Sequence, residues 1–178
     1  PERSYARAYD WSRKLARIDL PQSELTNPSG FIAAGLRAWV ATDRELVGLR
    51  FIEEQATVTA TVAERIEGTW STETAGRVAW RLQNGRVQLA VATPEGLNRH
   101  ELGPFEPPVV RISRAVQNEG WLVMWTARDD APRLLVVDTA SGELLDTLPA
   151  PPELTIARPQ PPSIWLSRGE WVERWEQG

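Results

Sequence analysis

The run from Gly76 to Ala92 constrains the fold more than any other, because two alternating stretches meet there at Asn84-Gly85. Asn-Gly is the pair that best tolerates positive φ at both central positions of a two-residue hairpin turn. Apolar residues alternate with smaller or polar ones on each side of the turn, at Val78, Trp80 and Leu82 and again at Val87, Leu89 and Val91. The pattern predicts two antiparallel strands in a half-buried sheet.

Composition limits the class of protein. A chain of 178 residues suits one domain, and an apolar fraction of 42% with 25% charged residues is too apolar for general disorder. The absence of cysteine excludes disulfides, thiolate nucleophiles and zinc–thiolate sites. A net charge of −4 gives no electrostatic reason to expect nucleic acid or an anionic membrane surface as a partner.

Further strands are expected along the chain. β-branched or apolar runs at Leu46–Ile52 and Thr57–Val62 have strand character. Trp121–Trp125 and Arg133–Val137 form a second hairpin, and both arms are apolar on consecutive residues. Such arms are typical of central strands with something packed on each face.

The N-terminal stretch from Glu2 to Leu20 is predicted to be an amphipathic helix that ends at Pro21. Its apolar stripe is Tyr5, Ala8, Trp11 or Ser12, Leu15 and Ile18. The stripe would dock either on the protein's own sheet or on a partner. The expected fold class is therefore α+β and mainly β, with this helix packed on a mostly antiparallel sheet or sandwich.

The expected organisation is one β-rich domain over residues 1–148, including the helix, followed by an appendage of the same domain over 149–178. The residues from Thr93 to Pro108 are expected to be an irregular connection, because they are rich in proline and glycine. Six prolines between Pro149 and Pro162 indicate a stiff extended segment rather than a packed one. A short terminal hairpin containing Trp171 follows it.

No constellation of residues indicates catalysis. His100 is the only histidine, and no nucleophile elbow, dinucleotide fingerprint, phosphate loop or zinc-protease motif occurs. We therefore expect no catalytic residue, no metal site and no cofactor. Nine tryptophans are unusual for a chain of this size. They either fill the core or form an aromatic platform, and Trp171 and Trp175 are the candidates for exposure after the proline-rich segment.

The order of the later strands resembles that of type IV pilin-like proteins, in particular pseudopilins of the J kind and minor pilins of the PilW kind. The resemblance rests on Val78 to Val91, Val109 to Ile112, Trp121-Leu-Val-Met-Trp125 and Pro132-Arg-Leu-Leu-Val-Val137, about a third of the chain. The processing site and apolar membrane helix of that family are absent, so the resemblance requires a segment removed before Pro1. Residues 150–178 have no counterpart.

The resemblance implies a non-enzymatic assembly subunit in a cell-envelope fibre or secretion apparatus, on the periplasmic or extracellular side. Its partners would be other protein subunits, and a membrane would be reached only through the missing segment. The expected contact residues are Tyr5, Tyr9, Trp11, Leu15, Ile18, Trp171 and Trp175. The alternative is a monomeric β-sandwich or barrel, cytoplasmic in that case, that binds a small apolar or aromatic ligand or a peptide through tryptophans.

Overall fold

The fold is built from strands alone. The computed structural model describes residues 5–8, 16–19, 25, 27–54, 57–72, 76–126, 132–150, 154–168 and 170–176. Within these ranges there are seventeen strands in five antiparallel sheets and no helix. The expectation of a β-rich chain is confirmed, and the expectation of an α+β fold with a helix packed on the sheet is wrong.

Four of the sheets are meanders, in which strands consecutive in sequence are neighbours in space. Sheet I contains β3 (Gly30–Ala34), β4 (Arg37–Ala41), β5 (Glu45–Glu54) and β6 (Thr57–Glu67). Sheet II contains β7 (Ser71–Thr72), β8 (Val78–Gln83), β9 (Arg86–Ala92) and β10 (Leu97–Leu102). Sheet III contains β11 (Ile112–Asn118), β12 (Trp121–Thr126), β13 (Arg133–Asp138) and β14 (Leu144–Pro149). Sheet IV contains β15 (Leu154–Gln160), β16 (Ser163–Arg168) and β17 (Trp171–Glu176).

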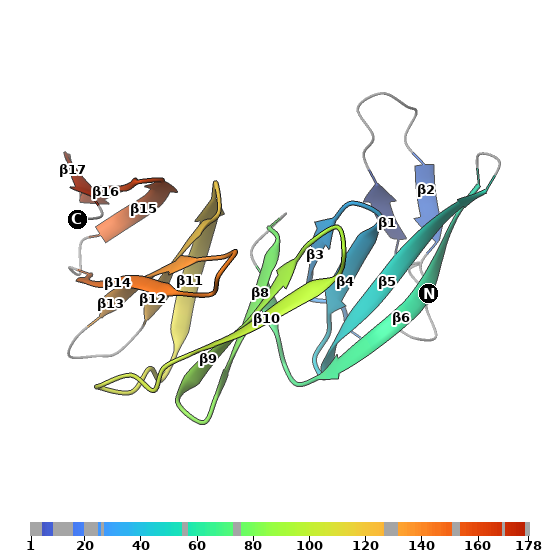
Figure 1. The fold of residues 1–178 in the computed structure, drawn as a ribbon, viewed down its shortest axis with the longest axis horizontal. Helices are drawn as coiled ribbons and strands as arrows, with labels where there is room; N and C mark the ends of the chain where they lie inside the picture. The colour runs from blue at the N-terminus through green and yellow to red at the C-terminus, as the bar shows by residue number, and fades with distance from the viewer. Residues whose placement is uncertain are drawn as a thin grey trace.

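The sheets repeat at a nearly constant interval. Their first strands begin at Gly30, Ser71, Ile112 and Leu154, at intervals of 41, 41 and 42 residues. Figure 1 shows sheets I to IV following one another along the long axis of the molecule, from sheet I on the right to sheet IV on the left. Four-stranded antiparallel meanders of 40 to 45 residues are also the repeating unit from which β-propellers are built.

The Asn84-Gly85 hairpin prediction is confirmed. Strands β8 and β9 pair in the register Trp80↔Leu89 and Gln83↔Arg86, and Asn84 and Gly85 have φ of 53° and 73°. The prediction of one buried face is too narrow, because the small residues on the other face are buried as well. Ala79, Ala90 and Ala92 belong to the core between sheets I and II, and Val78, Trp80, Val87, Leu89 and Val91 belong to the core between sheets II and III.

Sheet III is likewise covered on both faces, as its continuous apolar runs predict. Leu122 and Met124 of β12 lie in the core shared with sheet II. Trp121 and Val123 of the same strand lie in the core shared with sheet IV. Since neighbouring residues of a strand point to opposite faces, one strand contributes to two cores.

The N-terminal helix prediction is corrected by the first sheet of the chain. Strands β1 (Tyr5–Ala8) and β2 (Ala16–Asp19) form an antiparallel pair in which Tyr5 lies opposite Asp19 and Ala8 opposite Ala16. Strand β2 lies beside β6 of sheet I. The helical spacing came from a short stretch, and pairing with a neighbouring segment overrides such a weak local preference.

Two expected connections also contain strands. Strand β10 lies within the stretch from Thr93 to Pro108, and it pairs with β9 although four of its residues are polar. Strand β15 lies within the proline-rich stretch, and its Ala157 is fully buried against sheet III. Proline is tolerated in β15 because this strand lies at the edge of sheet IV.

Candidate functional site

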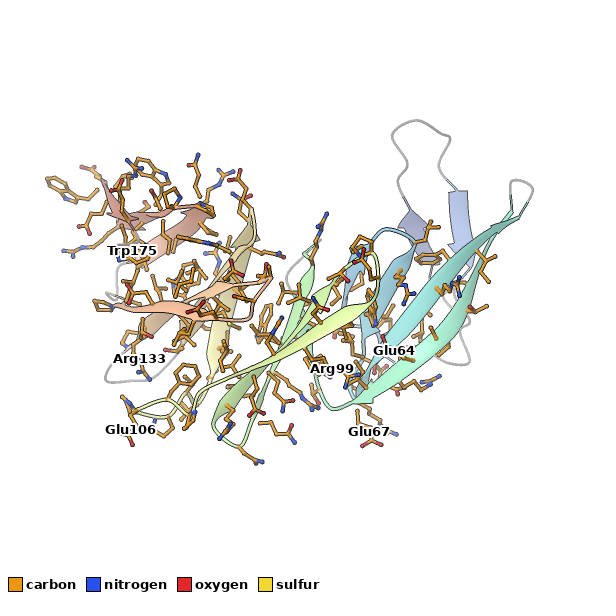
Figure 2. The ribbon with its side chains drawn as sticks, in the orientation of Figure 1. Glu64, Glu67, Arg99, Glu106, Arg133 and Trp175 are labelled. Atoms are coloured by element: carbon orange, nitrogen blue, oxygen red, sulfur yellow. The ribbon has the colours of Figure 1, made fainter. Side chains whose placement is uncertain are left out.

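Of the seven predicted contact residues, the structure describes Tyr5, Ile18, Trp171 and Trp175, and the two tryptophans differ in their surroundings. Trp171 is exposed over 74% of its surface at the start of β17. Trp175, on the same strand, instead packs against Trp121 of sheet III, with ring centroids 6.2 Å apart and planes inclined by 55°. Figure 2 shows Trp175 on the side of sheet IV that faces sheet III.

Of the five N-terminal candidates, the two that the structure describes lie on strands and not on a helix. Tyr5 lies on β1 and Ile18 on β2. Tyr9, Trp11 and Leu15 lie outside the described residues. The helix that was predicted to bring the five residues to one face is therefore not formed at Tyr5 or Ile18.

Strand β17 is an outer edge of sheet IV, whose strand order is β15-β16-β17. It carries two adjacent exposed apolar side chains, Trp171 and Val172, with Val172 exposed over 65% of its surface. Arg174 is fixed on the same strand, because its Nε donates to Ser163 Oγ at 3.0 Å and its guanidinium carbon lies 5.6 Å from the Trp165 ring centroid. These contacts tie β17 to the middle strand of sheet IV, β16.

A cleft of about 290 Å³ lies beside sheet II, and we call it the Trp70 cleft. Its lining includes Ile66 at the end of β6, Trp70 just before β7, Arg81 of β8, and Arg99 of β10. Trp70 is only 3% exposed, and its indole Nε1 has no hydrogen-bond partner among the described residues. The indole nitrogen is itself buried from solvent, and burial of an unpaired donor costs about 1–3 kcal/mol.

Arg81 is held over Trp70 by several contacts. Its guanidinium carbon lies 4.7 Å from the Trp70 ring centroid, its Nε donates to Gln88 Oε1 at 2.7 Å, and its Nη1 donates to the backbone carbonyl of Glu67. Gly68 has φ of 109°, and a Cβ there would collide with Arg81 Nη1. The chain thus uses glycine where the arginine side chain passes the backbone.

Glu101, the acidic residue in the lining of the cleft, already has hydrogen-bond partners. Gln88 Nε2 donates to Glu101 Oε2 at 3.2 Å, and Arg86 Nη1 donates to Glu101 Oε1 at 2.5 Å. The hydrogen bond from Gln88 and then that from Arg86 hold the pKa of Glu101 below its ordinary value. Glu101 therefore stays ionised near neutral pH, with both carboxylate oxygens engaged.

Arg99 spans the two sheets. Its Nη2 lies 3.8 Å from Glu64 Oε2 of sheet I, which is an ion-pair distance but too long for a hydrogen bond. Figure 2 shows Arg99 and Glu64 between sheets I and II. Glu64 Oε1 accepts a bond of 2.6 Å from Trp39 Nε1, so the glutamate is anchored inside sheet I.

His100 also lines the cleft, but it does not meet a cluster of carboxylates. Its ring packs against Gly142 of the turn between β13 and β14, where a Cβ would lie 2.2 Å from His100 Cγ. No group of three or more histidine, aspartate or glutamate side chains with metal-binding geometry occurs in the described part of the chain. The expectations of no catalytic residue and no cofactor stay predictions.

The cleft residues were not identified from sequence, although one signal was present. The Asn84-Gly85 turn fixes the β8–β9 register and so places Arg81 opposite Gln88. Trp70 and Arg99 come from segments whose pairing no local pattern indicates.

Comparison with known proteins does not assign the chain to a family: no family model and no curated protein matches it. Within the described ranges there is also no helix long and apolar enough to cross a membrane.

Proposed function

We propose that this chain is a non-enzymatic assembly unit that binds a protein partner at the edge strand β17. One observation supports the proposal above all: among the described residues, β17 is an edge of sheet IV, and it carries two exposed apolar side chains, Trp171 and Val172. The outer edge of a sheet presents unpaired backbone N–H and C=O groups, which form a template for a further strand.

The side chains of β17 favour such pairing. Trp171 and Val172 are both exposed, at consecutive positions and so on opposite faces of the strand, and tryptophan is among the residue types enriched in those that dominate binding energy. The alternating strand also carries Glu173, Arg174 and Glu176, which would select a partner strand by charge. The partner would be an extended polypeptide segment with an apolar residue opposite Trp171 or Val172.

This proposal retains the assembly role expected from the sequence but not the helix through which that role was to act. The cell-envelope location came only with the pilin resemblance and stays a prediction. Fractionation of cells that express the protein would test the location separately.

The test is selection of eight-residue peptides displayed on phage against the purified protein. We expect binders with alternating apolar residues and no proline, and we expect Trp171→Ser to weaken them at least tenfold. Leu36→Ser is the matched control, because Leu36 is 62% exposed in the turn between β3 and β4, far along the chain from β17.

Hydrogen exchange supplies the second measurement for the same complexes. Bound peptide should slow amide exchange along β17, because the partner strand takes up its outward N–H groups. Peptides that bind Trp171→Ser as tightly as the wild type, or that leave β17 exchange unchanged, would contradict the proposal.

A further inference from the structure

We infer that the partner strand at β17 is basic, with an arginine or lysine opposite Glu173 and between Trp171 and Trp175. The inference rests on the proposed function, because it names the chemistry of the segment that this edge would bind. It is carried by the charge of Glu173, by the two tryptophans beside it and by the acidity of the chain.

The pairing of β16 with β17 shows which side chains of the edge share a face. Trp175 lies opposite Ile164, and both belong to the core between sheets III and IV. Since successive side chains of a strand point to opposite faces, Trp171 and Glu173 point to the same face as Trp175. Glu173 therefore lies between two tryptophans.

The charges on the other face of β17 already pair with each other. Arg174 Nη2 lies 2.8 Å from Glu176 Oε1. The same guanidinium group donates from Nε to Ser163 Oγ and stacks on the Trp165 ring. This face therefore does not need a charged residue from a partner strand.

Glu173 is the unpaired charge of the strand. It is exposed, and it makes no hydrogen bond or ion pair with any other residue that the structure describes. Its neighbour on β16 is Leu166, which has no charge. A basic residue directly opposite Glu173 on an added strand would form a cross-strand ion pair, whereas an acidic residue there would be repelled.

The two tryptophans favour a cation at the same position. Residues two apart on a strand are roughly 7 Å apart, so a long side chain opposite Glu173 reaches both rings. Trp171 is 74% exposed, and its ring is free to stack on a guanidinium or ammonium group. Trp175 packs against Trp121 and supplies a fixed wall on the other side.

The charge of the whole chain favours the same kind of partner. Its net charge of −4 attracts a basic segment over a longer range and speeds its association, and salt screens this attraction. An extended basic segment therefore fits the edge better than an acidic or a neutral one.

The experiment compares three labelled heptapeptides by fluorescence polarisation. All have the sequence Thr-Val-Thr-X-Thr-Val-Thr, in which X is arginine, its neutral isostere citrulline, or glutamate. The arginine peptide should bind at least fivefold more tightly than the citrulline peptide, and the glutamate peptide should bind most weakly. The advantage of arginine should shrink as the salt concentration is raised, because an exposed ion pair is screened.

Glu173→Gln should remove the advantage of arginine over citrulline, and its exposed side chain makes the variant expected to fold. Glu176→Gln is the matched control, because Glu176 lies on the same strand but on the other face, and it should keep the advantage. Equal binding of the arginine and citrulline peptides, tighter binding of the glutamate peptide, or an arginine advantage that persists in Glu173→Gln overturns the inference and leaves the proposed function standing. Binding of none of the three peptides overturns both.

Discussion

Replacement of Ile164 by alanine tests whether sheet IV is held to the molecule by its own core. Ile164 lies on β16, the middle strand of the sheet, and is 0% exposed. Its core cluster contains Trp121, Val123 and Leu134 of sheet III but no residue of sheets I or II. Truncation of a fully buried isoleucine to alanine costs about 2–5 kcal/mol.

The cost should fall mainly on the terminal sheet. In repeat architectures each unit contacts only its neighbours. A destabilising substitution between sheets III and IV should therefore promote local unfolding of sheet IV more than that of the other sheets. A cost of 2–5 kcal/mol corresponds to an opening equilibrium about 30-fold to several thousand-fold larger. Amide hydrogen exchange of β15, β16 and β17 should accelerate by that factor, while exchange in β8 and β9 changes little.

Val172→Ala is the control for the Ile164 variant, because Val172 is on the adjacent strand but largely exposed. It should change stability by less than about 0.5 kcal/mol. The reasoning is refuted if Ile164→Ala accelerates exchange equally in β8 and β16, which would mean that the sheets open as one unit. It is refuted equally if exchange in β16 changes by less than tenfold.

Three further predictions concern other parts of the fold. A double-mutant cycle between Trp121 and Trp175 in urea unfolding should give a coupling of about 0.5–1.5 kcal/mol, because the rings meet at a tilted angle. Gly142→Ala should lower the free energy of unfolding by more than the ~1–2 kcal/mol that left-handed backbone strain costs, because the added Cβ would also collide with the His100 ring. The loss should be smaller when His100 is also replaced by alanine, because the collision is then removed. Hydrogen bonds from the following turn, the backbone N–H of Ser141 first, lower the pKa of Asp138 in the folded state. The ionised Asp138 therefore stabilises the fold above the pKa of the unfolded state, near 3.8, and this stabilisation is lost as the pH falls below that pKa. Asp138→Asn should therefore make the free energy of unfolding in urea depend less on pH between pH 5 and pH 3.

The sequence predicted those elements whose signal is local. The Asn84-Gly85 turn sets its own strand register through backbone conformation, and the apolar runs at Trp121–Trp125 and Arg133–Val137 predicted two-sided burial correctly. Each of these patterns lies within about twenty residues and needs no knowledge of distant neighbours.

The remaining parts depended on long-range contacts. Strand β10 is mostly polar because one of its faces looks toward Glu64 and the cleft, so its sequence has no apolar alternation. Strands β1 and β2 are too short to distinguish from a helix by periodicity. The sheets repeat about every 41 residues, but the four units share little sequence. The repeat therefore becomes visible only when the position of every strand is known.

The contact between sheets I and II explains why a cleft exists there. The face of sheet II toward sheet I carries Ala79, Ala90 and Ala92, and these small residues accommodate the large ring of Trp39. Gly48 opens the space inside sheet I for the same ring, since a Cβ there would lie 2.9 Å from Trp39 Nε1 and 2.6 Å from Glu64 Cγ.

Glu64 accepts a hydrogen bond from the Trp39 indole, and this geometry determines how closely it approaches Arg99. One carboxylate oxygen accepts from the Trp39 indole at 2.6 Å, and the other lies 3.8 Å from Arg99 Nη2, which is an ion-pair distance. Glu64→Gln removes the ion pair with Arg99 while keeping an acceptor for the Trp39 indole, so it should lower the free energy of unfolding in urea by less than about 1 kcal/mol, the contribution of an exposed ion pair. Strand β17 contains none of these residues, so the same substitution should leave peptide binding at sheet IV unchanged, and a loss of peptide binding in this variant would show that sheet IV does not act independently of sheet I.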